Sequence, residues 1–317
     1  MTGMLVGIAR MAAEAPALER KRRVEYFQLA ARTLLNRCGN AKMPFAWTVN
    51  PYRGCEFGCK YCYARSTHEY LELRRPEDFE TRIYAKHFTA SGLRGELARV
   101  KKGQAIAMGT ATDPYQPAER RFRLTRRVLG VVAEARGYSW SITTKSDLVA
   151  RDVDVLTRVA ERNSLMINMT VTTVDAELAR QVEPYAPRPD LRLGAVRELA
   201  RAGINVGVFV SPLMPLLNDS AESLRAVAEA AREAGAVRFG ARVLFLTPMP
   251  KECFLEWVGR DQAHLLALYE RYFVRGSSLP EGYEEEVREV VRRVREEVGF
   301  AGTIPGEAAG AQIELFT

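Results

Sequence analysis

The sequence lacks the marks of several protein classes. No run approaches the roughly 20 apolar residues that a membrane-spanning helix needs, which argues against an integral membrane protein. The apolar patch near the start is broken by Arg10 and Glu14, so it does not form the hydrophobic region of a secretion signal. The chain has only five cysteines, an odd number, which argues against a disulfide framework. We therefore expect a cytoplasmic protein with no membrane partner.

Composition and charge further limit the classes of protein to which the chain can belong. Apolar residues make up 47% and charged residues 27% of the 317 positions, which excludes a mostly disordered chain. Lysine and arginine number 46 against 39 aspartate and glutamate, a net charge of +7. This balance permits a polyanionic partner without requiring one.

Short β-rich runs alternate with helix-like segments along most of the chain. The predicted strands are Phe45–Val49, Arg82–His87, Gln104–Gly109, Ser139–Thr144, Leu165–Thr172, Ile204–Ser211 and Val237–Leu246. The predicted helices are Pro117–Arg136, Val153–Arg162, Asp190–Ala202, Ser220–Ala234, Gln262–Phe273 and Gly282–Val298. This alternation predicts an α/β protein built from βαβ units around a parallel sheet.

The two ends of the chain differ from this pattern. Apolar residues such as Val24, Phe27 and Ala31 have helical spacing in residues 18–37, which predicts an N-terminal helix after a loose arm. We therefore divide the chain into an arm and helix (1–44), a central α/β domain (45–260), and C-terminal helices with a flexible tail (261–317).

Three of the five cysteines lie within eight residues, in NPYRGCEFGCKYCYAR. Cys55, Cys59 and Cys62 have the spacing C-x3-C-x2-C, and Gly54 and Gly58 loosen the backbone so that the sulfur atoms can converge. Three thiolates can hold three corners of a 4Fe–4S cluster and leave the fourth iron open. The alternative is a structural zinc site of Cys3His type with His68 as fourth ligand, although zinc ligands usually come as two separated pairs.

The spacing C-x3-C-x2-C with an aromatic residue, here Tyr61, before the third cysteine resembles the radical S-adenosylmethionine enzymes. The resemblance implies that the open iron binds the amino and carboxylate groups of S-adenosylmethionine. It also implies reductive cleavage of that cofactor to a 5′-deoxyadenosyl radical, with electrons from a flavodoxin or ferredoxin type of donor. The implied fold is a partial (β/α)6 barrel of the TIM type, here with an N-terminal helical extension and a C-terminal helical segment.

The resemblance also assigns cofactor contacts to strand ends. Thr110, Thr112 and Asp113, in GTATDPYQPAE, match the position that holds the methionine amino group, although Asp113 is also a good turn former. Lys145, in TTKS, suits the methionine carboxylate, with an ordinary surface lysine as the alternative.

Two further segments complete the expected cofactor site. Asn168 and Thr170, in NMTVTT, place small polar groups where a ribose can bind. The segment Val208–Asp219 offers backbone and apolar surface for an adenine edge, or is a plain buried strand.

Together, NPYRGC, CYAR, GTATDPYQPAE, TKS and SPLMPLLND resemble the branch related to spore photoproduct lyase, over about residues 24–257. This implies a nucleic-acid substrate and DNA repair-like work. In the lyase a cysteine at the end of the second barrel strand donates a hydrogen atom, and Thr110 stands at that position here. Because a hydroxyl O–H bond is too strong to replace a thiol, we do not expect the lyase reaction itself. Tyr115 is an alternative donor, and Cys253 a weaker one if it reaches the barrel mouth.

Two other features bear on a DNA partner. Arg120, Arg123 and Arg127 fall on one face of a predicted helix and can meet phosphates, or form an ordinary solvated face. The tail residues resemble the short peptide by which bacterial repair proteins bind the sliding clamp, and the anchor would be formed by Gln312, Ile313, Leu315 and Phe316.

We therefore predict a radical S-adenosylmethionine enzyme that acts on nucleic acid. The first alternative is the same chemistry on a small molecule or peptide. The second is a non-catalytic zinc or iron–sulfur nucleic-acid-binding protein, which would not require the polar strand ends.

Overall fold

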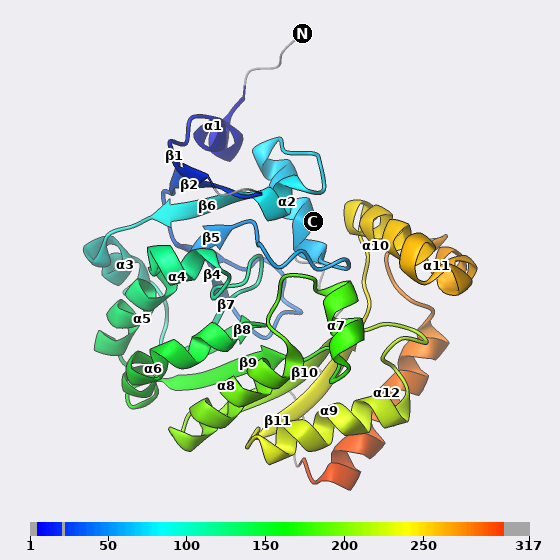
Figure 1. Cartoon of the computed structure of the whole chain (residues 1–317). Coiled ribbons are helices and arrows are strands. Elements are labelled where there is room, and N and C mark those ends of the chain that lie inside the picture. Colours follow the sequence, from blue (N-terminus) through cyan, green and yellow to red (C-terminus); the bar gives the residue numbers. More distant parts are fainter. Residues whose placement is uncertain (1–4, 21–22, 301–317) are drawn as a thin grey trace.

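A seven-stranded sheet forms the centre of the protein (Figure 1). The computed structural model describes residues 5–20 and 23–300. In spatial order the strands are β11 (Arg238–Val243), β10 (Val206–Leu213), β9 (Ser164–Thr170), β8 (Ser139–Thr144), β7 (Ala105–Met108), β4 (Trp47–Val49) and β3 (Leu35–Arg37). Neighbours from β4 to β11 are all parallel, and β3 is antiparallel at the edge. These six parallel strands confirm the predicted partial (β/α)6 barrel.

Helices cover the outer face of this sheet. They are α3 (Ala90–Leu97), α5 (Leu124–Glu134), α6 (Val153–Ala160), α8 (Pro189–Arg201), α9 (Ala221–Glu233) and α12 (Glu281–Val298). On β8, Trp140 and Ile142 are buried in the core shared with these helices. The intervening Ser141 is only half-buried and Thr143 is exposed. Because alternate residues of a strand face opposite sides, short polar side chains line the inner face of the barrel.

A second sheet of four strands lies beside the barrel, and it corrects the predicted N-terminal helix. Its order is β1 (Ala17–Arg20), β2 (Glu25–Ala30), β6 (Arg82–His87) and β5 (Tyr52–Arg53). The helix predicted over residues 18–37 is wrong, because this stretch forms β1, β2 and β3. The expected loose arm instead contains a short helix, α1 (Gly7–Ala13). The run Arg82–His87 is a strand as predicted, but it belongs to this sheet and not to the barrel.

Packing on both faces explains why the N-terminal prediction failed. Tyr26 and Leu29 of β2 are both fully buried, but Tyr26 packs with Tyr52 and Ile83 while Leu29 packs with Ala12 and Tyr84 in a separate cluster. A strand buried on both faces does not show clean alternation of apolar and polar residues. Its pairing with β6 therefore overrides the local helical spacing.

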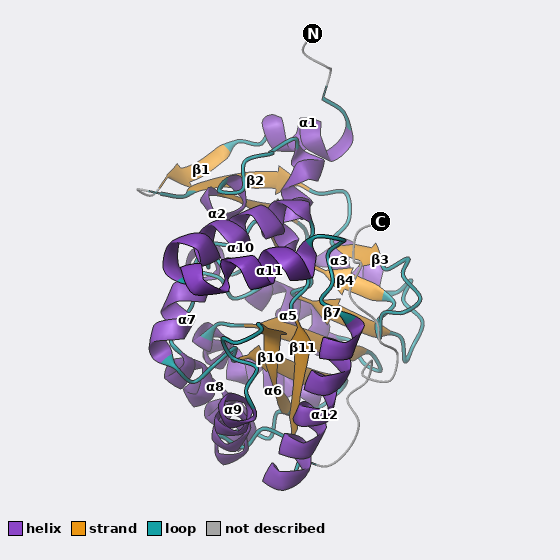
Figure 2. Cartoon of the chain, turned by 90° about the vertical axis from the view of Figure 1, so that its right-hand side faces the viewer, coloured by secondary structure: helices purple, strands orange, loops and turns teal. Residues whose placement is uncertain are grey.

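The remaining helices lie in the connections. They are η1 (Tyr63–Leu71), α2 (Asp78–Thr81), α4 (Ala118–Phe122), η2 (Asp147–Asp152), α7 (Ala176–Val182), α10 (Pro248–Asp261), η3 (Ala263–Leu265) and α11 (Leu266–Phe273). Figure 2 shows α10 and α11 side by side. The helix predicted over Pro117–Arg136 is divided into α4 and α5 because Arg123 has a left-handed backbone with φ of 51°. In the described part of the chain, no helix is long and apolar enough to cross a membrane.

Candidate active site around the cysteine loop

The three clustered cysteines lie in residues 54–62, here called the cysteine loop, which follows β5. Cys55 and Cys59 are buried, Cys62 is half-buried, and all three are free thiols. Gly54 and Gly58 have φ of 79° and 66°, values that favour glycine. A Cβ on Gly54 would also lie 2.8 Å from a backbone carbonyl oxygen, so the loop needs glycine there.

The chemistry of these thiols fits a buried metal cluster. Burial raises the pKa of Cys59 to about 12 and also raises the pKa values of Cys55 and Cys62. Each thiol lies close enough to the others to affect a pKa, and Lys145 opposes the rise at Cys59 and Cys62. Such thiols become thiolates when a metal replaces their protons.

The structure does not bring His68 and the cysteines together as the ligand set of a zinc ion. His68 is buried, its ring nitrogen Nε2 lies 3.1 Å from the carbonyl oxygen of Arg82, and it packs edge-on against Phe79. Burial lowers the pKa of His68 to about 4. Within residues 5–20 and 23–300, no three histidine, cysteine, aspartate or glutamate side chains gather closely enough to hold a single ion.

Thr112 and Gln116 support the cysteine loop from the loop after β7. The Thr112 hydroxyl donates to the carbonyl oxygen of Gly54 at 2.5 Å, and Gln116 Nε2 donates to the same oxygen at 2.9 Å. Gln116 Oε1 accepts from the backbone N–H of Glu56 at 3.1 Å. Both side chains are buried. The structure thus gives Thr112 a role in holding the loop, where the sequence predicted a cofactor contact.

Asp113 joins the ends of β7 and β8. Its carboxylate accepts from the backbone N–H of Tyr115 at 2.8 Å, from the Thr144 hydroxyl at 2.7 Å and from the backbone N–H of Lys145 at 2.7 Å. Burial raises the pKa of Asp113, and these hydrogen bonds oppose the rise. The turn-forming role considered for Asp113 is therefore present.

A second support, formed by residues 182–185 after α7, lies against the other part of the cysteine loop. The backbone N–H of Lys60 donates to the carbonyl oxygen of Val182 at 2.9 Å, and that of Tyr185 donates to the carbonyl oxygen of Phe57 at 3.2 Å. The Tyr185 ring lies directly over Gly58, where a Cβ would be 2.9 Å from a ring carbon. Segments about 60 and 120 residues away along the chain thus hold the loop from two sides.

Glu183, which the sequence reasoning missed, is the centre of a buried polar network. Its carboxylate accepts from the hydroxyls of Tyr61 and Thr172 and forms an ion pair of 2.5 Å with Arg192 of α8. The side chains of Glu183 and Arg192 are 0% and 1% exposed. Burial alone would raise the pKa of Glu183, but Arg192, Lys145 and the two hydroxyls outweigh it and lower the pKa.

Lys145 lies next to Tyr61 of the cysteine loop. Lys145 Nζ lies 3.9 Å from Glu183 Oε1 and 5.6 Å from the centroid of the Tyr61 ring. The Lys145 side chain is 18% exposed, so it keeps access to solvent. Thr110 lies nearby at the end of β7, where its hydroxyl accepts from Asn50 at 3.0 Å and its carbonyl oxygen accepts from the Tyr63 hydroxyl.

Asn168 and Thr170 lie on β9. The side-chain amide of Asn168 donates to the Ser141 hydroxyl of β8 at 2.8 Å, so Asn168 belongs to the polar inner face. Thr170 is buried, and its carbonyl oxygen accepts from Arg192 at 3.1 Å.

Of the two proposed hydrogen donors, Tyr115 is not brought to the inner face. Tyr115 is 0% exposed in the core between sheet and helices. Burial, with Asp152 nearby, raises its pKa. Cys253 lies half-buried on α10, where Arg65 and Glu80 are its charged neighbours. Tyr115 is therefore not proposed as a catalytic group, and a role for Cys253 stays a prediction. The four clamp-motif residues of the tail lie outside the described residues.

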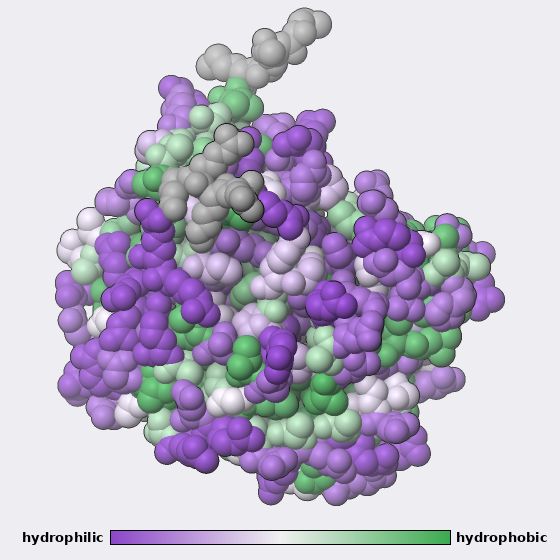
Figure 3. All heavy atoms as spheres, in the orientation of Figure 1, coloured by the Kyte–Doolittle hydropathy of each residue, from purple (hydrophilic) through white to green (hydrophobic). Residues whose placement is uncertain are grey.

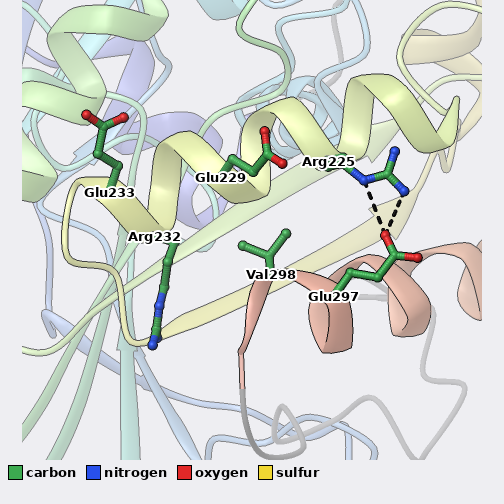
Figure 4. A pocket seen from close by; sticks show the side chains of 6 residues that line it. All are labelled: Arg225, Glu229, Arg232, Glu233, Glu297 and Val298. Carbon is green, nitrogen blue, oxygen red and sulfur yellow. Dashed lines mark hydrogen bonds and ion pairs between the residues drawn. The ribbon is translucent and has the colours of Figure 1, made fainter.

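An open crevice on the outer surface is separate from the site. It lies between α9 and α12 and is lined by Arg225, Glu229, Arg232, Glu233, Glu297 and Val298 (Figure 4). Arg225 and Glu297 are paired across it at 2.6 Å. It contains none of the residues that surround the cysteine loop.

Comparison with known sequences places the chain in a family. The model of the Radical SAM superfamily matches residues 49–231, which is more than half of the chain. An uncharacterised protein of Mycobacterium tuberculosis is 35% identical over 281 residues, which cover 88% of this chain and 82% of that protein. An uncharacterised protein of Methanocaldococcus jannaschii is 30% identical over 205 residues, covering 62% of this chain and 71% of that protein.

Comparison with solved structures agrees in fold. Spore photoproduct lyase complexed with dinucleoside spore photoproduct has a TM-score of 0.67 and 15% identity, with 86% of this chain and 79% of that chain covered. Another spore photoproduct lyase structure has bound AdoMet, with the same TM-score and coverage. At this level of identity the likeness shows a shared fold. The chain therefore belongs to the radical S-adenosylmethionine superfamily of enzymes, whose cofactors are a 4Fe–4S cluster and S-adenosylmethionine.

Proposed function

We propose that this enzyme acts on nucleic acid, with Cys55, Cys59 and Cys62 as the ligands of its 4Fe–4S cluster. When bound, the cluster and S-adenosylmethionine supply a 5′-deoxyadenosyl radical that abstracts a hydrogen atom from the substrate. The chain itself buries the three thiols, holds their loop from two sides, and presents polar strand ends beside it. A flavodoxin or ferredoxin type of protein is the proposed electron donor.

Roles for the polar residues follow from their positions. Lys145 is the proposed contact for the methionine carboxylate, because its ammonium group is partly exposed next to the cysteine loop. Thr110 is the proposed neighbour of the methionine amino group of S-adenosylmethionine. Asn168 is the proposed neighbour of its ribose. Both residues lie at half-buried positions on the barrel strands or at their ends. Thr170 is the second proposed ribose neighbour, through its place on the same strand as Asn168.

An exposed cluster of arginines carries the proposal of a nucleic-acid substrate. Arg120 lies on α4, Arg123 at the break, and Arg127 on the first turns of α5, and all three are exposed. No carboxylate among the described residues forms an ion pair with any of them. Figure 3 shows a hydrophilic surface over this part of the molecule. Helices that follow a barrel strand begin at the carboxyl edge, where the active site lies, so these cations are suited to meet phosphates near the site.

Two measurements test the proposal. Full-length protein, reconstituted anaerobically with iron and sulfide, is expected to bind a single-stranded oligonucleotide with an affinity that falls as salt rises. Combining Arg120→Gln, Arg123→Asn and Arg127→Gln is expected to weaken binding and to reduce the salt slope by about 2, at roughly 0.7 for each phosphate contact. Asparagine is chosen at position 123 because it tolerates the left-handed backbone.

A matched control removes three arginines whose charges are already paired, at Arg225, Arg260 and Arg292. This variant is expected to keep the wild-type affinity and slope. Equal effects in both triple variants, or no effect in either, would refute the nucleic-acid surface. Reductive formation of 5′-deoxyadenosine that responds to small molecules or peptides but not to oligonucleotides would favour the alternative substrate class.

The tail supports one further partner. Gln312, Ile313, Leu315 and Phe316 match a sliding-clamp peptide in residue type, so a synthetic peptide of residues 303–317 is expected to bind a bacterial clamp in solution. Replacing the two last apolar anchors by alanine should abolish binding, and a peptide that shows no binding would remove this partner.

A further inference from the structure

Glu183 contacts the cysteine loop directly, and Arg192 is connected to the loop through its ion pair with Glu183. Tyr61, which stands between two of the three cysteines, donates its hydroxyl to Glu183. The backbone of the residue before Glu183 accepts from Lys60, which also lies between those cysteines. The network is therefore attached to the loop by a side chain and by the backbone.

The charges in this network do not cancel. Glu183 carries one negative charge and is paired with Arg192 at 2.5 Å and with Lys145 at 3.9 Å, so these three side chains together carry a net charge of +1. Burial weakens screening by water, so this charge acts directly on whatever the thiols bind. A buried pair of this kind gives weak support to stability, because desolvation offsets much of its attraction.

We propose that Glu183 and Arg192 are positioning residues that hold Lys145 next to Tyr61 of the cysteine loop and set the electrostatic field at the bound cluster. This inference rests on the proposed cluster ligands. Net positive charge favours the more negative, reduced form of a cluster and so raises its reduction potential. Arg192 and Lys145 act in this direction, and Glu183 acts against them.

The test compares two variants that remove opposite charges. Full-length wild type, Glu183→Gln and Arg192→Met are reconstituted anaerobically, and the midpoint potential of each cluster is measured by a redox titration followed by electron paramagnetic resonance. Glu183→Gln is expected to raise the potential and Arg192→Met to lower it. Arg126→Gln, which removes an arginine paired with Asp152 and Asp154 on the outer helices, is the control and should leave the potential unchanged.

The opposite directions of the two expected shifts in midpoint potential distinguish this electrostatic role from a purely structural one. Loosening of the loop would move both variants in the same direction, and that result, or no shift in either, would overturn the proposal. If Arg192→Met does not fold by circular dichroism, Lys145→Met replaces it, because it also removes a positive charge and that side chain is partly exposed. It is expected to lower the potential, and an unchanged value would equally overturn the proposal. A wild-type chain that forms no 4Fe–4S spectrum would instead overturn the cluster assignment itself, and this inference with it.

Discussion

Lys86 lowers the stability of the protein at neutral pH, and replacing it should reveal by how much. It lies on β6, 6% exposed, and its backbone N–H donates to the carbonyl oxygen of Pro51 at 3.0 Å. Burial, with help from the nearby Arg53 charge, lowers its pKa from 10.5 to about 7. Below pH 7 the lysine is protonated in both the folded and the unfolded chain. Between pH 7 and 10.5 the unfolded chain binds more protons, so the free energy of unfolding rises with pH.

The size of this effect follows from the two pKa values. A fall from 10.5 to about 7 corresponds to about 2 kcal/mol of stability gained through Lys86 between pH 7 and pH 9. Lys86→Met keeps most of the side-chain volume and removes the titrating group. The variant is therefore expected to have a higher free energy of unfolding than wild type at pH 7. This difference is expected to be about 2 kcal/mol smaller at pH 9 than at pH 7.

Urea denaturation of the apo chain at pH 7, 8 and 9 provides the assay. Other groups, including the cysteines, also titrate in this range, so the informative quantity is the difference between variant and wild type at each pH. Lys101→Met, at an exposed position, serves as the control. A difference that does not change between pH 7 and pH 9 would refute the reasoning.

Two other predictions concern the cysteine loop. Gln116→Leu leaves the N–H of Glu56 without its acceptor, and is expected to lower the free energy of unfolding by about 1–3 kcal/mol. An unchanged urea midpoint would contradict this. Gly54→Ala places a Cβ 2.8 Å from a backbone oxygen and is expected to lose most of the iron on reconstitution, whereas Gly95→Ala, with open space around it, should bind iron as wild type does. Equal iron contents would show that the close approach is unimportant.

The sequence predicted the barrel well because its strands are separated by clear helix and turn signals. β8 has the predicted bounds, Ser139–Thr144, and β9 to β11 differ by a few residues at their ends. The N-terminal sheet was missed because β2 is buried on both faces, so its apolar and polar residues do not alternate with the period of two that is typical of a strand. Arg123 divides a predicted helix at a point where the buried Glu119 carboxylate accepts from the backbone N–H groups of Thr125 and Arg126, and residue type alone does not signal this break.

The candidate site, like the fold, was predicted from the sequence only in part. The cysteines, Tyr61 and Lys145 follow from a local motif and a strand end, and the structure brings them together. Glu183 and Arg192 carry no local signal except that Arg192 stands on the buried face of α8, where a charged residue needs a partner. The partner is identified only when α7 and α8 are placed beside a loop about 120 residues earlier.

This separation along the chain has a consequence for the order of assembly. The contact between Tyr61 and Glu183 spans 122 residues, and that between Thr112 and Gly54 spans 58. Contacts between distant residues form late, because the intervening chain must first be ordered. In a zinc finger the metal drives folding of a short segment. Here we expect the thiols to reach their supported arrangement only after the chain has folded through α8. If they hold the cluster as proposed, we expect iron to enter a largely complete protein, so that iron content reports completed folding.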